Sequence, residues 1–167
     1  VGYDTYCRIL DEVLKEEQGL KVEEDVNCQI DLNVTSYIPD SYIKDQNQKI
    51  EIYQDIALCK NEEDISNIID EIIDRFGNMP DEIENLLEIS RIKQLAKKKN
   101  LIKIQSRKNS IVFTYESNKF DNTSLSDMIE KYGNRIQFSS GLKPMITLKL
   151  EKQGEKGILQ EVKEFLK

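Results

Sequence analysis

The stretch that decides the fold is residues 62–80, with the sequence EEDISNIIDEIIDRFGNMP. Its isoleucines recur three and four positions apart, which places side chains on one face of an α-helix. We therefore expect a helix from about Glu62 to Phe76. The isoleucines expected to face the core are Ile65, Ile68, Ile69, Ile72 and Ile73. Gly77 stands where a glycine commonly ends a helix, and Pro80 fits the first turn of the next one.

Two further helices complete a helical N-terminal half. Asp45 followed by Gln48 has the form of a capping box, and it opens a helix that reaches about Ala57. After Pro80, a third helix runs to about Lys99. The connections are short, so we expect the three helices to pack against one another.

The segment before these helices carries weaker signals. Residues 3–17 have apolar side chains at helical spacing, and the acidic residues 23–25 follow as a candidate linker. Residues 30–34 alternate between apolar and polar types, as in a half-buried strand, and Pro39-Asp40 marks a turn after it. Because Val1 is no initiator, we expect the chain to be a fragment of a longer protein.

The last third of the chain changes from helical to alternating periodicity. Residues 102–104 and 111–115 alternate across a turn at 108–109, which predicts a β-hairpin. The other expected elements are a helix at 125–132, strands at 135–138 and 145–150, and a closing helix from about Gly157. The fold class is therefore predicted to be α+β, a helical N-terminal half packed with a small antiparallel sheet in the C-terminal half, with helices on one face.

The composition argues against an active site. The chain has no histidine, which removes the commonest general base and the usual nucleophile pairs. Cys7, Cys28 and Cys59 are widely spaced and are expected to be small buried hydrophobes rather than disulfides or metal ligands. The glycine-rich phosphate-binding motifs are missing as well. We expect no catalytic residue, no cofactor and no metal site.

Charge and hydropathy limit the partners. The net charge is −7, whereas a domain that holds nucleic acid by itself usually presents a basic face, so we expect no direct binding of nucleic acid by this chain. The basic run at Lys97–Lys99 is expected to complement the dipole at a helix C-terminus. No apolar run approaches the length of a membrane span, and the N-terminus lacks a signal pattern, so a cytoplasmic location without membrane contact is expected.

Four segments in order carry a family resemblance. They are VGYDTYC at residues 1–7, LNV with YIPDSYI at 32–43, QKIEIY at 48–53, and EIIDRFG followed by MP at 71–80. Together they resemble the C-terminal domain of bacterial transcription-repair coupling factors, the Mfd family, with its E-L-x-D-R-[FY]-G-x-x-P signature. The first segment resembles the end of that family's motor, which implies that residues 1–24 are a tail and linker and residues 25–167 a regulatory domain.

The resemblance also implies a function. Members of this family are large ATPases that translocate on DNA, displace stalled RNA polymerase and recruit UvrA through a UvrB-like N-terminal module. The resemblance implies that the C-terminal domain packs against that module, which masks the UvrA-binding surface and restrains the motor. The ATPase motifs lie upstream in the family, so the chain is expected to be an autoinhibitory domain and not an enzyme.

The central helix offers a candidate contact face. Asn67, Asp70, Glu71 and Asp74 lie opposite the isoleucines at helical spacing, and Glu71 and Asp74 match the acidic positions of the signature. Carboxylates in a row suit arginines on a partner, although a solvated helix face is the other interpretation. Arg75 is expected to pair with Asp74 or to cap the helix.

An alternative function is an accessory nucleic-acid-binding domain of the same motor. Its candidate residues are Lys97, Lys98, Lys99, Lys103, Arg107 and Lys108. The tyrosines at 37, 42 and 53 are expected to be core and interface aromatics, and Asp40 and Asp45 turn and capping residues.

Overall fold

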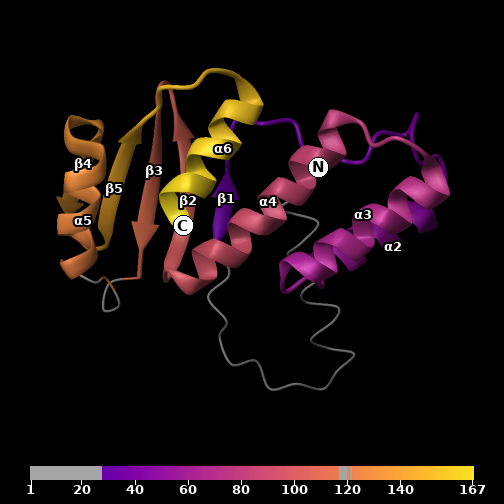
Figure 1. The fold of residues 1–167 in the computed structure, drawn as a ribbon, viewed down its shortest axis with the longest axis horizontal. Helices are drawn as coiled ribbons and strands as arrows, with labels where there is room; N and C mark the ends of the chain where they lie inside the picture. The colour runs from indigo at the N-terminus through magenta and orange to yellow at the C-terminus, as the bar shows by residue number, and fades with distance from the viewer. Residues whose placement is uncertain (1–27, 117–119, 121) are drawn as a thin grey trace. The chain divides into compact units, whose positions relative to one another are not determined.

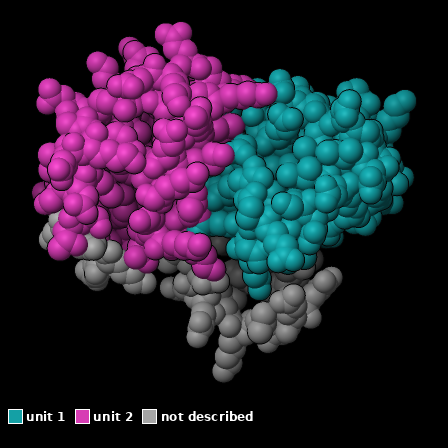
Figure 2. All heavy atoms as spheres, in the orientation of Figure 1, with its two compact units in different colours: residues 1–25, 34–94 teal, residues 26–33, 95–167 magenta. Residues whose placement is uncertain are grey.

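The computed structural model describes residues 28–116, 120 and 122–167. They divide into two compact units (Figure 2): unit 1 contains residues 34–94, and unit 2 contains residues 28–33 together with those from 95 onwards. The predicted helix at residues 3–17 lies outside the described residues, as does the VGYDTYC segment. In the part that is described, no helix combines the length and apolar character needed to cross a membrane.

Unit 1 is built from the three predicted helices, α2 (Gln46–Ala57), α3 (Glu62–Phe76) and α4 (Asp81–Lys98), the last of which ends in unit 2 (Figure 1). The predicted cap of α2 is confirmed, because the Asp45 carboxylate accepts hydrogen bonds from the backbone N–H groups of Asn47 and Gln48. Asn61 caps α3 in the same way, and Gly77 follows its last turn with a φ of 90°. Local capping chemistry therefore sets these boundaries.

The core of unit 1 lies between the apolar faces of these helices. Its buried side chains include Ile38, Ile43, Ile52, Tyr53, Ile56, Ile65, Ile68, Ile72, Ile83, Leu86, Leu87, Ile89 and Ile92. The expectation that Ile73 faces the core is wrong, because its side chain is 42% exposed. One position along a helix turns the side chain by about 100°, so Ile72 fills the core and Ile73 points past its edge.

Unit 2 contains a five-stranded sheet in the order β1-β2-β3-β5-β4. The strands are β1 (Gln29–Asp31), β2 (Leu101–Arg107), β3 (Ser110–Tyr115), β4 (Ile136–Ser140) and β5 (Pro144–Lys149). The predicted hairpin is confirmed as β2–β3, and β5 pairs antiparallel with both β3 and β4. The sheet is mixed rather than purely antiparallel, because β1 pairs with β2 in parallel across a long helical crossover. The α+β class is confirmed.

Two helices pack on one face of this sheet, as expected. α6 (Gly154–Leu166) stacks the ring of Phe165 on Phe113 of β3, with ring centroids 4.2 Å apart. Tyr132 ends α5 (Asn122–Tyr132) and lies 5.5 Å from the same Phe165 ring. A short 3₁₀ turn, η1 (Gly133–Arg135), leads from α5 into β4. α6 begins three residues before the predicted Gly157, at Gly154 with a φ of 81°.

One buried carboxylate fastens α6 to the end of the sheet. Glu161 is only 5% exposed, and it accepts hydrogen bonds from the backbone N–H groups of Glu151 and Lys152 at 3.1 and 3.2 Å. Nη2 of Arg135 donates to the same carboxylate at 2.6 Å. Arg135 also donates to the carbonyl of Lys149, so these charged groups are satisfied inside the fold.

Candidate partner-binding face

The four residues of the predicted contact face lie on α3, but not in equivalent surroundings. Asn67, Asp70 and Asp74 are exposed, whereas Glu71 is half-buried. In the described part of the chain, Asp70 and Asp74 make no ion pair. We call Asn67, Asp70, Glu71 and Asp74 the acidic face of α3, with Glu71 at its margin.

Glu71 is turned towards α2 by Arg75. Nη1 of Arg75 donates to Glu71 Oε1 at 3.1 Å and lies 3.8 Å from Glu51 Oε1 on α2. The guanidinium also covers the ring of Phe76 at 5.0 Å. The expected pairing of Arg75 with Asp74 is therefore wrong. The partner four positions back is Glu71, and this spacing brings helical side chains together.

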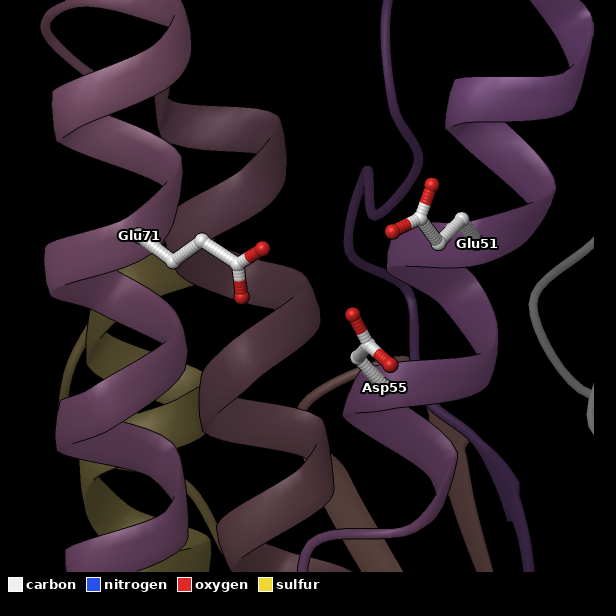
Figure 3. A group of neighbouring side chains, drawn as sticks. All are labelled: Glu51, Asp55 and Glu71. Carbon is white, nitrogen blue, oxygen red and sulfur yellow. The ribbon is translucent and has the colours of Figure 1, made fainter.

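Three carboxylates gather between α2 and α3 (Figure 3). Glu51 and Asp55 project from α2 towards Glu71, and oxygen atoms of the three groups lie within 4.8 Å of one another. Burial raises the pKa of Asp55, the charges of Glu71 and Glu51 raise it further, and Arg75 opposes them. Hard cations such as Ca²⁺ bind oxygen ligands of this kind. Arg75 already supplies positive charge to two of the three, so the arrangement has an explanation without an ion.

The signature segments contact one another within unit 1. The hydroxyl of Tyr42 donates to the carbonyl of Gly77 at 2.5 Å, and the Tyr42 and Phe76 rings lie 5.9 Å apart. The backbone N–H of Ile38 donates to the hydroxyl of Tyr53 at 2.8 Å. The loop that contains YIPDSYI is thus attached to both α2 and the end of α3. Sequence reasoning placed these tyrosines in cores and interfaces without finding this connection.

The remaining predicted residues agree with structural roles. Lys49 is buried and forms an ion pair with Asp40, which also stands in the predicted turn. Tyr37, the first residue of the YIPDSYI segment, is 45% exposed. Cys28 is buried and Cys59 half-buried, both as free thiols, while Cys7 lies outside the described residues. Burial raises the pKa of Cys59 to about 11, with Asp64 and Asp55 adding to the effect, which makes it a poor nucleophile at neutral pH.

Comparison with known proteins identifies the family. A family profile described as "TRCF domain" matches residues 32–126, more than half of the chain. The chain belongs to the TRCF domain family. The transcription-repair-coupling factor of Rickettsia prowazekii is 32% identical over 169 residues, which cover 99% of the chain and 15% of that protein. The Staphylococcus haemolyticus relative is 41% identical over 95 residues, covering 56% of the chain and 8% of that protein.

A solved structure agrees with this assignment. The crystal structure of a C-terminal domain of transcription-repair coupling factor superposes with a TM-score of 0.73 at 26% identity, and covers 81% of this chain and 87% of the other. The chain thus corresponds to the C-terminal domain of transcription-repair coupling factors. It spans 15% or less of the length of the relatives described above. The resemblance found in the signature segments is confirmed.

Proposed function

We propose that this TRCF domain is a regulatory module without catalytic activity, and that the acidic face of α3 docks on another part of the same polypeptide. The family resemblance suggests the UvrB-like N-terminal module as the docking partner. Docking there masks the surface for UvrA and restrains the DNA-translocating motor, and contact with RNA polymerase runs through the parent protein. We also propose residues 1–24 as the tail of the motor and residues 25–167 as the regulatory domain.

The observation that carries this proposal is the exposed pair of carboxylates at Asp70 and Asp74. Neither forms an ion pair within the described residues, and they lie one helical turn apart. Residues 34–94 also hold 14 Asp and Glu against 6 Lys and Arg, so the surroundings repel other anions and attract a basic partner. Free carboxylates with this spacing suit arginine side chains, which bind carboxylates in a bidentate manner.

The exposed Ile73 supports the same interpretation. It lies on the same side of α3 as Asp70 and Asp74, three positions from one and adjacent to the other. Binding energy at interfaces concentrates on apolar anchors surrounded by polar residues that exclude water. An isoleucine beside two exposed carboxylates has this composition. Exposed ion pairs contribute only about 0.2–1 kcal/mol each, so docking through this face is readily reversed.

A calorimetric titration of this chain against the separately expressed UvrB-like module tests the proposal. We expect Asp70→Lys combined with Asp74→Lys to weaken binding by about 2 kcal/mol, or about 30-fold, and higher salt to weaken wild-type binding. Glu71 is left unchanged because its substitution would also release Arg75. The matched control is Asp127→Lys with Glu130→Lys on α5, an equal charge change on two exposed positions.

Two results would contradict the proposal. Full-strength binding by the Asp70→Lys, Asp74→Lys variant would show that another surface docks. Equal weakening by the α5 control would show that net charge, and not this face, determines the affinity. A melting curve of each variant separates loss of docking from loss of folding.

A further inference from the structure

The net charge of the chain conceals two units of opposite sign. Unit 1 between residues 34 and 94 has a net charge of −8, from 6 Lys and Arg against 14 Asp and Glu. Unit 2, residues 26–33 and 95–167, has a net charge of +6, from 15 Lys and Arg against 9 Asp and Glu. The overall value of −7 therefore does not describe the sheet unit, which is basic.

The cations of unit 2 include a group on the sheet face opposite α6. Phe113 packs on α6 and pairs with Ile104 and Ile146, so these residues define the helix-covered face. Successive side chains of a strand alternate between faces. Lys103 and Arg107 lie an odd number of positions from Ile104, and Lys149 lies an odd number from Ile146. Their side chains are therefore on the opposite face.

The spacing of these three side chains is set by the register. Arg107 is opposite Ser110, and Ser110 is opposite Lys149, so the two cations lie in one row about 10 Å apart across two strand spacings. Lys103 lies four residues along β2 from Arg107, a further distance of about 13 Å. Arg107 and Lys149 are exposed and Lys103 is half-buried. Among the described residues, none of the three side chains forms an ion pair.

The polar groups beside these cations suit phosphate rather than bases. In the neighbouring row, Gln105 and Thr147 offer amide and hydroxyl groups on either side of the buried Val112, and Asp31 at the edge of the row is its one carboxylate. The paired residues of this face include no aromatic side chain, and sequence-independent binding of single strands relies on aromatic stacking. At the hairpin end, Lys108 adds a fourth exposed cation.

We propose that this basic sheet face, defined by Lys103, Arg107 and Lys149 with Lys108 at its end, binds the phosphate backbone of a nucleic-acid duplex. A duplex presents one phosphate charge per about 3.4 Å of helix axis on each strand, so four cations spread over about 10 by 13 Å can each meet a phosphate. The inference goes beyond the docking proposed for α3. It uses residues of the other unit and does not depend on that proposal.

The test is fluorescence anisotropy of a labelled 20-base-pair DNA duplex with the whole chain. Four phosphate contacts predict a slope of log K against log salt near −3.6, which is about a 150-fold loss of affinity between 50 and 200 mM salt. The variant Lys103→Gln, Arg107→Gln, Lys149→Gln should bind at least 30-fold more weakly at 50 mM salt. Arg107→Gln alone, at an exposed strand end, should reduce the magnitude of this slope by about 0.9 without affecting folding.

A control variant of equal charge change separates this face from the general charge of unit 2. Lys131→Gln, Lys156→Gln, Lys167→Gln changes exposed lysines of α5 and the α6 region, and should keep affinity within threefold of the wild type. The proposal is overturned if the duplex causes no anisotropy change up to about 0.1 mM protein. It is also overturned if the control variant loses as much affinity, or if polyglutamate competes as well as unlabelled duplex, since an acidic protein would then be the better partner.

Discussion

Replacing the buried Glu161 by glutamine should destabilise unit 2 through a small set of identifiable contacts. The carboxylate accepts two backbone N–H groups and Nη2 of Arg135. Breaking a buried ion pair commonly costs about 3–5 kcal/mol. In the variant, Arg135, which is 26% exposed, still donates to the Lys149 carbonyl and still pairs with Glu151. The glutamine side chain also retains one oxygen that can accept hydrogen bonds. We therefore expect a loss of about 2 kcal/mol in the free energy of unfolding.

Urea unfolding followed by circular dichroism measures this loss, and a fall of about 4–8 °C in Tm should accompany it. Amide hydrogen exchange gives a local measure, because the N–H groups of Glu151 and Lys152 should exchange faster in Glu161→Gln. The control is Glu164→Gln, one turn along α6 and exposed, which should stay within about 0.5 kcal/mol of the wild type. Wild-type stability together with unchanged exchange in Glu161→Gln would refute the assigned role of this carboxylate.

Three further perturbations test other contacts. Tyr42→Phe removes the hydrogen bond to the Gly77 carbonyl and should lower the free energy of unfolding by about 1 kcal/mol in urea titrations. Gly77→Ala should cost about 1 kcal/mol or more, measured in the same way, because Gly77 has a φ of 90° and a Cβ is strained there. The strain is in the backbone, since a Cβ would meet no atom of the described residues within 4 Å apart from its own chain neighbours. The thiol of Cys59 has a pKa raised to about 11, so its labelling rate by a disulfide reagent should be very low at pH 7 and rise about tenfold per pH unit towards pH 11.

A different outcome would contradict each of these three predictions. Equal stability of Tyr42→Phe and the wild type would mean that water donates to the Gly77 carbonyl in place of the hydroxyl, without loss of stability. If Gly77→Ala is no less stable than the wild type, the loop after α3 adopts another conformation. The labelling experiment uses a chain in which Cys7 and Cys28 are alanine, and a rate that levels off near pH 8.5 would show an ordinary, solvated thiol.

The helices were predictable from the sequence because local chemistry decides them. The bounds of α3 follow from its isoleucine spacing, its acidic first turn and Gly77, and all of these signals lie within the segment itself. The β2–β3 hairpin was equally accessible, since its alternation and turn are adjacent in sequence. The direction in which β1 pairs was not accessible, because its partner strand lies beyond three helices and no local signal specifies it.

The candidate site was predicted less well than the fold. Helical spacing placed Asn67, Asp70 and Asp74 on an exposed face correctly. It could not show that Glu71 turns towards Arg75 and α2, because that depends on which helix packs alongside. The whole-chain charge describes neither unit, since an average over 167 residues conceals a basic unit and an acidic one.

The parallel pairing of β1 with β2 determines where this domain can be cut. Gln29–Asp31 covers one edge of β2 with backbone hydrogen bonds, although it precedes the segment matched by the family profile. A fragment that begins at residue 32 leaves the long strand β2 with an unpaired edge, and such edges recruit strands from other molecules. Recombinant fragments that keep three extra residues at the start should therefore remain monomeric at concentrations where the shorter ones aggregate.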